Sequence, residues 1–135
     1  MKTIEEAENE IIEEFELFDD WMDKYNYIIE LGKSLPLIDP QYKDEAHLIP
    51  GCQSQVWLHA ELSDGRLIFR ADSDAIITKG IINLLIRVLS GHTPQEIAAA
   101  PLAYIDKIGI KEHLSPTRSN GLVSMIEQIR KYAAE

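Results

Sequence analysis

The chain has 135 residues, of which 45% are hydrophobic and 27% are charged, a composition typical of a soluble globular protein. This length predicts a single domain over residues 1–135, with a core that needs no disulfides. The net charge of −10 argues against a nucleic-acid partner, and the single cysteine excludes an internal disulfide and a four-thiolate zinc or iron–sulfur site.

Two helices are predicted at the start of the chain. Residues 3–6 have the pattern of a capping box, which opens the first helix. Apolar side chains then recur at intervals of three and four residues and form one stripe: Ile4, Ala7, Ile11, Phe15, Phe18, Met22 and Tyr25. A bend is expected at Asp19 and Asp20, which are suited to cap a second helix. That helix is expected to run to Leu31, with Gly32 ending it.

The first helical region is strongly acidic. Residues 5–23 carry ten acidic side chains and no basic one. A charge run of this kind is typical of a solvated helical face. The alternative is a docking surface for a basic partner.

A loop and a hairpin follow. Residues 33–50 contain three prolines and no clear period, which predicts a long loop leading to Cys52. Residues 55–62 and 67–71 alternate between apolar and polar side chains, with the turn signal Asp64-Gly65 between them. This pattern predicts an antiparallel hairpin with one buried face. A short third strand near Leu48 would add stability to it.

The remainder of the chain is predicted to be helical. Residues 75–89 are apolar nearly all round, which indicates a core helix that ends at Gly91. A second capping box at 93–96 opens a short helix that stops before Pro101, and Ser115-Pro116 opens the last helix. Helices, a hairpin and further helices predict an α+β domain, with helices on one face of a small antiparallel sheet of two or three strands.

No membrane segment or export signal is expected. The first fifteen residues are acidic and lack the apolar run of a signal peptide. The most continuous apolar stretch, residues 81–89, is too short to cross a bilayer. With one unpaired cysteine, these features predict a cytoplasmic protein without a membrane partner.

Cys52 lies in the segment Ile49-Pro50-Gly51-Cys52-Gln53-Ser54-Gln55-Val56-Trp57. Pro50 and Gly51 mark a turn, and small polar residues follow, so the surroundings favour display of the thiol. A lone thiol of this kind can act as a nucleophile or carry a group covalently. The alternative is an inert cysteine that packs as a small hydrophobic residue.

Residues 51–57, with the sequence Gly-Cys-Gln-Ser-Gln-Val-Trp, resemble the signature of the SufE family of sulfur-acceptor proteins. Three further stretches resemble the family in the same order: residues 25–33, residues 72–75 with Lys79-Gly80, and residues 113–122. The resemblance spans residues 15–133, nearly the whole chain.

The resemblance implies a SufE-like fold, similar to that of iron–sulfur scaffold proteins. It implies that Cys52 takes persulfide sulfur from a pyridoxal-phosphate cysteine desulfurase of the SufS type and stimulates that enzyme. The sulfur would pass on to iron–sulfur cluster assembly on a scaffold complex of the SufBCD type. The protein would thus be a covalent carrier and activator rather than a stand-alone enzyme, with no cofactor or metal of its own.

Gln53, Asp74 and Arg118 are candidates for binding the partner or positioning the loop, and Gln55 is considered with them. Gln53 directly follows the thiol and Gln55 lies three residues after it, and both could orient it. Asp74 and Arg118 match residues that the family ties to the active site. Asp74 has an alternative role, since the Asp-Ser-Asp run at 72–74 is suited to cap the following helix. Arg118 near a helix start opposes the helix dipole, which favours a use beyond local structure.

Other functions are weighed against the carrier. His47, five residues before Cys52, is a candidate base for a Cys-His pair. A related carrier could feed a different sulfur acceptor. A redox sensor or peroxidase would need a resolving thiol, which this chain lacks. A pure interaction module would leave Cys52 unreactive.

Overall fold

The computed structural model describes residues 2–52 and 54–135. Its described elements are α1 (Ile4–Glu16), α2 (Trp21–Lys33), β1 (Val56–Ser63), β2 (Arg66–Ser73), α3 (Ile76–Leu89), α4 (Pro94–Ala99), α5 (Ala103–Ile108), α6 (Ile110–His113) and α7 (Pro116–Ala134). Two short 3-10 helices, Pro40–Tyr42 and Glu45–His47, lie in the loop before Cys52. This α+β architecture around a two-stranded antiparallel sheet confirms the predicted fold class.

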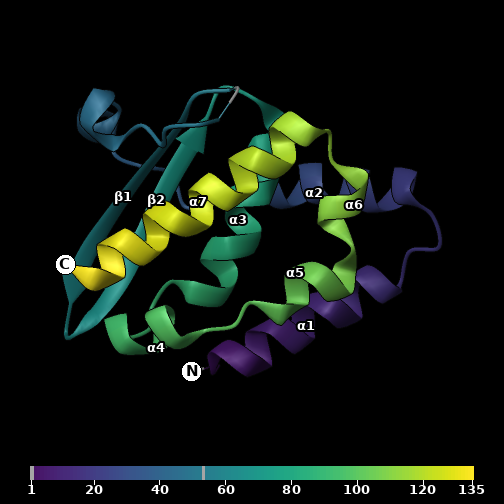
Figure 1. Ribbon diagram of the computed structural model, residues 1–135, viewed down its shortest axis with the longest axis horizontal. Helices are drawn as coiled ribbons and strands as arrows, with labels where there is room; N and C mark the ends of the chain where they lie inside the picture. The colour runs from purple at the N-terminus through teal and green to yellow at the C-terminus, as the bar shows by residue number, and fades with distance from the viewer. Residues whose placement is uncertain (1, 53) are drawn as a thin grey trace.

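Helix α3 is the centre of the fold (Figure 1), in contact with β2, α1, α2 and α7. Eleven of its fourteen residues are buried, as the apolar sequence predicts. Two of them are polar, Thr78 and Asn83. Asn83 donates a hydrogen bond to the Leu31 carbonyl at the end of α2, 2.7 Å away. Helix α7 covers the same face of the hairpin, where the Tyr132 hydroxyl donates to the Leu58 carbonyl at 3.0 Å. Helices therefore pack on one face of the sheet, as predicted.

The prediction that Gly32 ends the second helix is wrong, because α2 continues to Lys33. Gly32 is inside the helix and faces Gly80 of α3. A Cβ on Gly32 would lie 2.9 Å from the Gly80 nitrogen, and a Cβ on Gly80 would lie 1.9 Å from the Ile28 carbonyl oxygen. The two glycines thus allow α2 and α3 to pack closely, which is why a glycine stands in a helix interior despite its low propensity.

The predicted helix starts are confirmed. Thr3 and Thr93 each form a complete capping box, and Asp20 and Ser115 accept hydrogen bonds from the first turns of α2 and α7. The sequence patterns did not reveal α5 and α6. Among the described residues, no helix is both long and apolar enough to cross a membrane.

The hairpin pairs Val56 with Ser73 and turns at Asp64-Gly65, as predicted. The third strand near Leu48 is reduced to a single bridge with Trp57. The loop before Cys52 covers the outer face of the hairpin instead. Within it, the Tyr42 ring stacks on His59 with centroids 4.0 Å apart, and Lys43 Nζ lies 4.6 Å from the Trp57 ring. The long loop is therefore fixed to the sheet up to the segment that carries the thiol.

The acidic run at 5–23 is only partly a solvated face. Glu8 is buried and accepts a hydrogen bond from the Tyr104 amide at 3.3 Å. Glu10 and Glu14 both form ion pairs with Arg87 of α3, at 3.0 and 2.9 Å. Several of the predicted surface charges therefore fix α1 to the rest of the domain.

Candidate functional site

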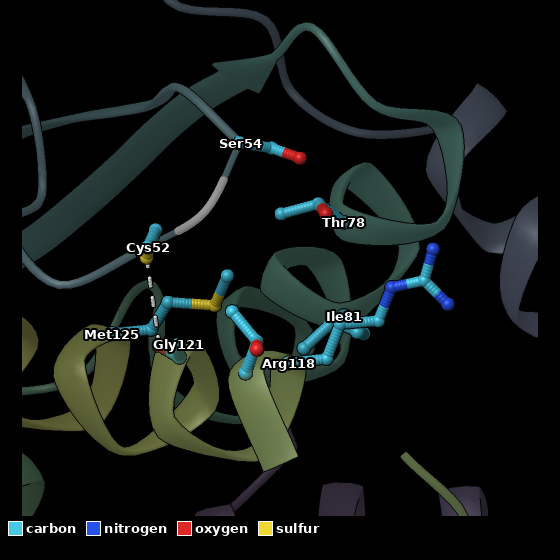
Figure 2. A pocket seen from close by; sticks show the side chains of 8 residues that line it. Cys52, Ser54, Thr78, Ile81, Arg118, Gly121 and Met125 are labelled. Carbon is cyan, nitrogen blue, oxygen red and sulfur yellow. Dashed lines mark hydrogen bonds between the residues drawn. The ribbon is translucent and has the colours of Figure 1, made fainter. Parts of the chain in front are cut away.

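Cys52 lines a cavity of about 280 Å³ between the loop before β1 and helices α3 and α7 (Figure 2). The described lining residues are Cys52, Ser54, Thr78, Ile81, Thr117, Arg118, Gly121 and Met125. The structure thus brings Cys52 and Arg118, predicted from distant segments, to one cavity. The guanidinium of Arg118 lies on the side of the cavity away from the thiol.

Small residues seat the thiol loop on α7. Gly51 has a φ of 84°, in the left-handed region that favours glycine, and a Cβ there would lie 2.6 Å from Ser124 Oγ. A Cβ on Gly121 would lie 3.5 Å from Cys52 Sγ. The thiol itself is half-buried and donates a long hydrogen bond of 3.7 Å to the Gly121 carbonyl oxygen. The loop therefore rests directly on the helix backbone.

The surroundings of the thiol favour its neutral form. Burial raises the pKa of the Cys52 thiol. The Gly121 carbonyl oxygen beside it can only accept a hydrogen bond, so it cannot donate one to a thiolate. Burial and the neighbouring carbonyl therefore both favour the neutral thiol over the thiolate.

We expect Cys52 to react slowly with iodoacetamide at neutral pH. The thiolate is the nucleophile, so a raised pKa leaves less of it available, and the rate should continue to rise above the pH at which a free cysteine levels off. The measurement is the alkylation rate against pH, with a short unstructured peptide containing the same Gly-Cys-Gln-Ser sequence as control. A folded protein that reacts as fast as this peptide at neutral pH would contradict the burial effect.

Asp74 holds the thiol loop rather than the helix that follows it. Its Oδ1 accepts a hydrogen bond from the Gln55 amide at 3.1 Å, and its own amide donates to the Gln55 carbonyl at 3.3 Å. Ser73 Oγ donates to the same carbonyl at 2.7 Å. The predicted capping of the next helix is wrong, because the N-cap residue of α3 is Ala75, which offers no side-chain cap. Asp74 is thus a loop-positioning residue that fixes the backbone three positions after Cys52.

Replacing Asp74 by alanine is expected to loosen this attachment. The Gln55 amide loses its side-chain acceptor in Asp74→Ala, whereas Asp74→Asn keeps an oxygen in the same place. Amide hydrogen exchange measured by NMR should therefore be faster at Gln55 in the alanine variant and close to wild type in the asparagine variant. Equal exchange at Gln55 in the wild type and Asp74→Ala would show that the carboxylate does not hold the loop.

Arg118 is in the first turn of α7, where its amide donates to the Ser115 hydroxyl. Its guanidinium donates to the Tyr25 hydroxyl of α2 and lies 6.0 Å from the centre of that ring. The Tyr25 contact explains how an exposed arginine is kept at the cavity rim against the helix dipole.

The remaining sequence candidates lie elsewhere. Gln53 lies outside the described residues, and Gln55 contributes its backbone to the loop contacts above. His47 is not available as a base for Cys52, because its Nδ1 contacts Asp44 at 2.7 Å and its Nε2 contacts His59 at 3.2 Å. Within residues 2–52 and 54–135, no group of three or more histidine, cysteine or acidic side chains is arranged to hold a metal ion.

Several cavity residues were not predicted. Thr117 and Gly121 lie in stretches that resemble the family, but the resemblance assigned them no role. Thr78 and Met125 fall on helices whose sequence patterns indicate only core packing. Tyr25 was placed on the apolar stripe of the second helix, and its hydroxyl contact with Arg118 depends on tertiary structure.

Comparisons with known proteins identify a family and similar chains. The family model described as "SufE: Fe-S metabolism associated domain" matches residues 9–133. An uncharacterized SufE-like protein of Rhizobium etli is 42% identical over 130 residues, covering 93% of this chain and 88% of the relative. A second one, from Rhizobium meliloti, is 41% identical over 130 residues, covering 93% of each chain.

The fold has a counterpart among solved structures. The solution structure of a hypothetical protein from Thermus thermophilus matches with a TM-score of 0.78 at 19% identity, covering 95% of this chain and 93% of that one. At 19% identity the match shows a similar fold and nothing about function. Since the family model spans nearly the whole chain and the bacterial relatives share two fifths of its residues, the chain belongs to the SufE family, whose domain is associated with iron–sulfur metabolism.

Proposed function

We propose that Cys52 accepts sulfur as a persulfide from a cytoplasmic SufS-type cysteine desulfurase and passes it to a SufBCD-type scaffold for iron–sulfur cluster assembly. The observation that carries this proposal is the placement of the only cysteine in the chain. It lies on a loop at a cavity that also receives Arg118, and Asp74 fixes the backbone just beyond it. Family membership supports a desulfurase partner.

The proposed transfer is a thiol–disulfide type of exchange. The sulfur of Cys52 attacks the outer sulfur of the desulfurase persulfide, a new S–S bond forms, and the old one breaks. The desulfurase cysteine leaves with the electron pair and takes up the proton that Cys52 loses. Atoms and electrons balance without an external oxidant, and the product is a Cys52 perthiolate.

The protected position of the thiol fits a carrier. The raised pKa of Cys52 limits its reaction with other electrophiles before the donor arrives. The lack of a second cysteine means that the persulfide cannot be resolved to a disulfide within the chain. Sulfur bound to Cys52 therefore leaves only when an external thiol or an acceptor protein removes it.

The test of the proposal is the turnover of a SufS-type desulfurase with cysteine and a thiol reductant, with and without this protein. Removal of persulfide sulfur from the desulfurase frees its cysteine for the next cycle, so sulfide production should increase with the concentration of this protein until it saturates. A desulfurase whose rate does not change at saturating concentrations would contradict the proposal.

Arg118→Ala is expected to reduce desulfurase stimulation several-fold without destabilising the fold. The side chain is exposed at the cavity rim and its lost contacts are at the surface, so the free energy of unfolding should stay within about 0.5 kcal/mol of wild type. Titration of the desulfurase with each variant, together with urea unfolding, measures both effects.

The matched control removes charge from the acidic helix. Glu5, Glu13 and Glu16 of α1 are exposed, and their neutralisation to glutamine should change binding only slightly at physiological salt, where screening acts over about 8 Å. If the glutamine variant loses binding and Arg118→Ala does not, the partner docks on α1 rather than at the cavity.

A further inference from the structure

We propose that Tyr25 of α2 is a positioning residue for desulfurase stimulation, because its hydroxyl holds the Arg118 guanidinium at the cavity rim in the place where the partner meets it. Tyr25 is not among the described residues that line the cavity, so it acts through Arg118. The inference rests on the proposed function, since it concerns how Arg118 contributes to that function. It adds a residue of α2 to a site so far built from the thiol loop, α3 and α7.

Helix α2 contacts the segment around the start of α7 at two points, one helical turn apart. Tyr25 accepts a hydrogen bond from Arg118 in the first turn of α7. Trp21, four residues earlier on the same face of α2, stacks on the ring of His113, with ring centroids 4.0 Å apart and ring planes 17° apart. The His113 ring is itself fixed, because its Nδ1 donates to the Gly109 carbonyl at 3.1 Å. His113 and Arg118 lie on either side of the N-cap of α7, so the two contacts fix where that helix starts relative to α2.

The α2 side of this contact is firmly held. Helix α2 packs on α3 through the close approach of Gly32 and Gly80, and the buried Asn83 of α3 donates to a carbonyl in the last turn of α2 at 2.7 Å. The Tyr25 side chain is half-buried and packs against the core, whereas Arg118 is exposed. A ring anchored in this way can fix a long side chain that its own surroundings leave free.

The Tyr25 hydroxyl holds Arg118 without neutralising it. Among the described residues, the Arg118 guanidinium donates to this neutral oxygen and forms no ion pair with a carboxylate. Arg87 shows the contrast, because its guanidinium is paired with Glu10 and Glu14 and joins α3 to α1. A guanidinium has five N–H donors in a fixed fork, so Arg118 keeps its charge and most of its donors for an anionic group of the desulfurase.

Holding an exposed arginine in place before the partner arrives improves binding. A free arginine side chain samples many rotamers, and each long side chain that becomes ordered on binding lowers the affinity. Tyr25→Phe keeps the ring and its packing but removes the oxygen that accepts the hydrogen bond. In this variant the partner has to order Arg118 itself, so binding weakens while the sulfur chemistry at Cys52 is unchanged.

The test is a titration of a SufS-type desulfurase with the wild type, Tyr25→Phe and Tyr27→Phe. We expect Tyr25→Phe to raise the concentration at half-maximal stimulation about threefold, with the same maximal rate, because the variant adds only an ordering step to binding. Tyr27→Phe is the matched control, since it removes the hydroxyl that donates to Glu14 of α1 and should leave the titration unchanged. In an Arg118→Ala background, Tyr25→Phe should have no further effect, because the residue that it positions is gone. Urea unfolding shows that each variant is folded.

A second measurement tests the contact without the desulfurase. Nitrogen relaxation of Arg118 Nε, measured by NMR in the free protein, reports how far the side chain is ordered, and we expect a lower order parameter in Tyr25→Phe than in the wild type and Tyr27→Phe. An unchanged order parameter, a Tyr25→Phe titration that coincides with wild type, or an equal loss with and without Arg118 would overturn the inference. A wild-type protein that does not stimulate the desulfurase would instead contradict the proposed function, and the order of Arg118 would still decide whether Tyr25 holds it.

Discussion

Replacing Cys52 by serine is expected to abolish sulfur loading and desulfurase stimulation while leaving the fold intact. Cys52 is the only cysteine in the chain, and a hydroxyl does not form a persulfide. The side chain is half-buried at the edge of the core and makes one long hydrogen bond, so the free energy of unfolding should change by less than about 1 kcal/mol. Sulfide production by a SufS-type desulfurase and urea unfolding give the two readouts.

Ser124→Ala is the matched control for the serine variant. Ser124 contacts the same loop from α7, close to the position of Gly51, but does not line the cavity beside the thiol. Stimulation by this variant should remain near wild type. Full stimulation by Cys52→Ser would instead identify the protein as an activator that acts by binding alone.

Gly80→Ala is expected to have the largest effect on stability. Helix propensity alone favours alanine over glycine by about 1 kcal/mol in a helix interior. At Gly80, however, the added Cβ would lie 1.9 Å from the Ile28 carbonyl oxygen, which belongs to the backbone of α2 and cannot rotate away. Separating α2 from α3 should cost at least the 1–3 kcal/mol that is roughly typical of overpacking, measured as a loss in the free energy of urea unfolding.

Gly121→Ala is the control that separates the effect of helix propensity on stability from the effect of close helix packing. Gly121 is also buried within a helix, but a Cβ there would meet Cys52 Sγ at an ordinary contact distance of 3.5 Å. This variant should be as stable as the wild type or more so. The change in the free energy of unfolding is therefore expected to have opposite signs for Gly80→Ala and Gly121→Ala. A Gly80→Ala variant as stable as Gly121→Ala would show that α2 and α3 are not packed as closely as described.

Local signals made much of the fold predictable. The threonine boxes at 3–6 and 93–96 fix helix starts through hydrogen bonds that span three residues, and the Asp64-Gly65 turn fixes the hairpin. The nearly continuous apolar sequence of α3 marks it as the central helix. Each of these features depends on neighbours in the sequence, which is why patterns alone reveal it.

Tertiary contacts determine what the patterns missed. Gly32 has the same sequence signal whether it ends a helix or allows close packing, and only Gly80 on another helix decides between them. Helices α5 and α6 have six and four residues, too short to show a helical period, and the left-handed Gly109 separates them. Tyr104 shows how they are held, since it is fully buried and donates to the Leu84 carbonyl of α3 at 3.0 Å.

The site was predictable only through the resemblance. Cys52 stands out as the single thiol, but nothing in the spacing of Asp74 and Arg118 brings them near it. The structure explains both: Asp74 binds the backbone of Gln55, and α7 carries Arg118 to the cavity rim. No sequence pattern points to Thr78, because a threonine within an apolar helix is expected to pack in the core. Only the structure shows that it lines the cavity.

The most direct test of sulfur transfer is the mass of the protein after incubation with a SufS-type desulfurase and cysteine, without reductant. We expect the wild-type chain to gain one sulfur atom, located by digestion on the peptide that contains Cys52, and Cys52→Ser to gain none. If the desulfurase carries its own persulfide under these conditions and the wild-type chain gains no sulfur, Cys52 is not a sulfur acceptor.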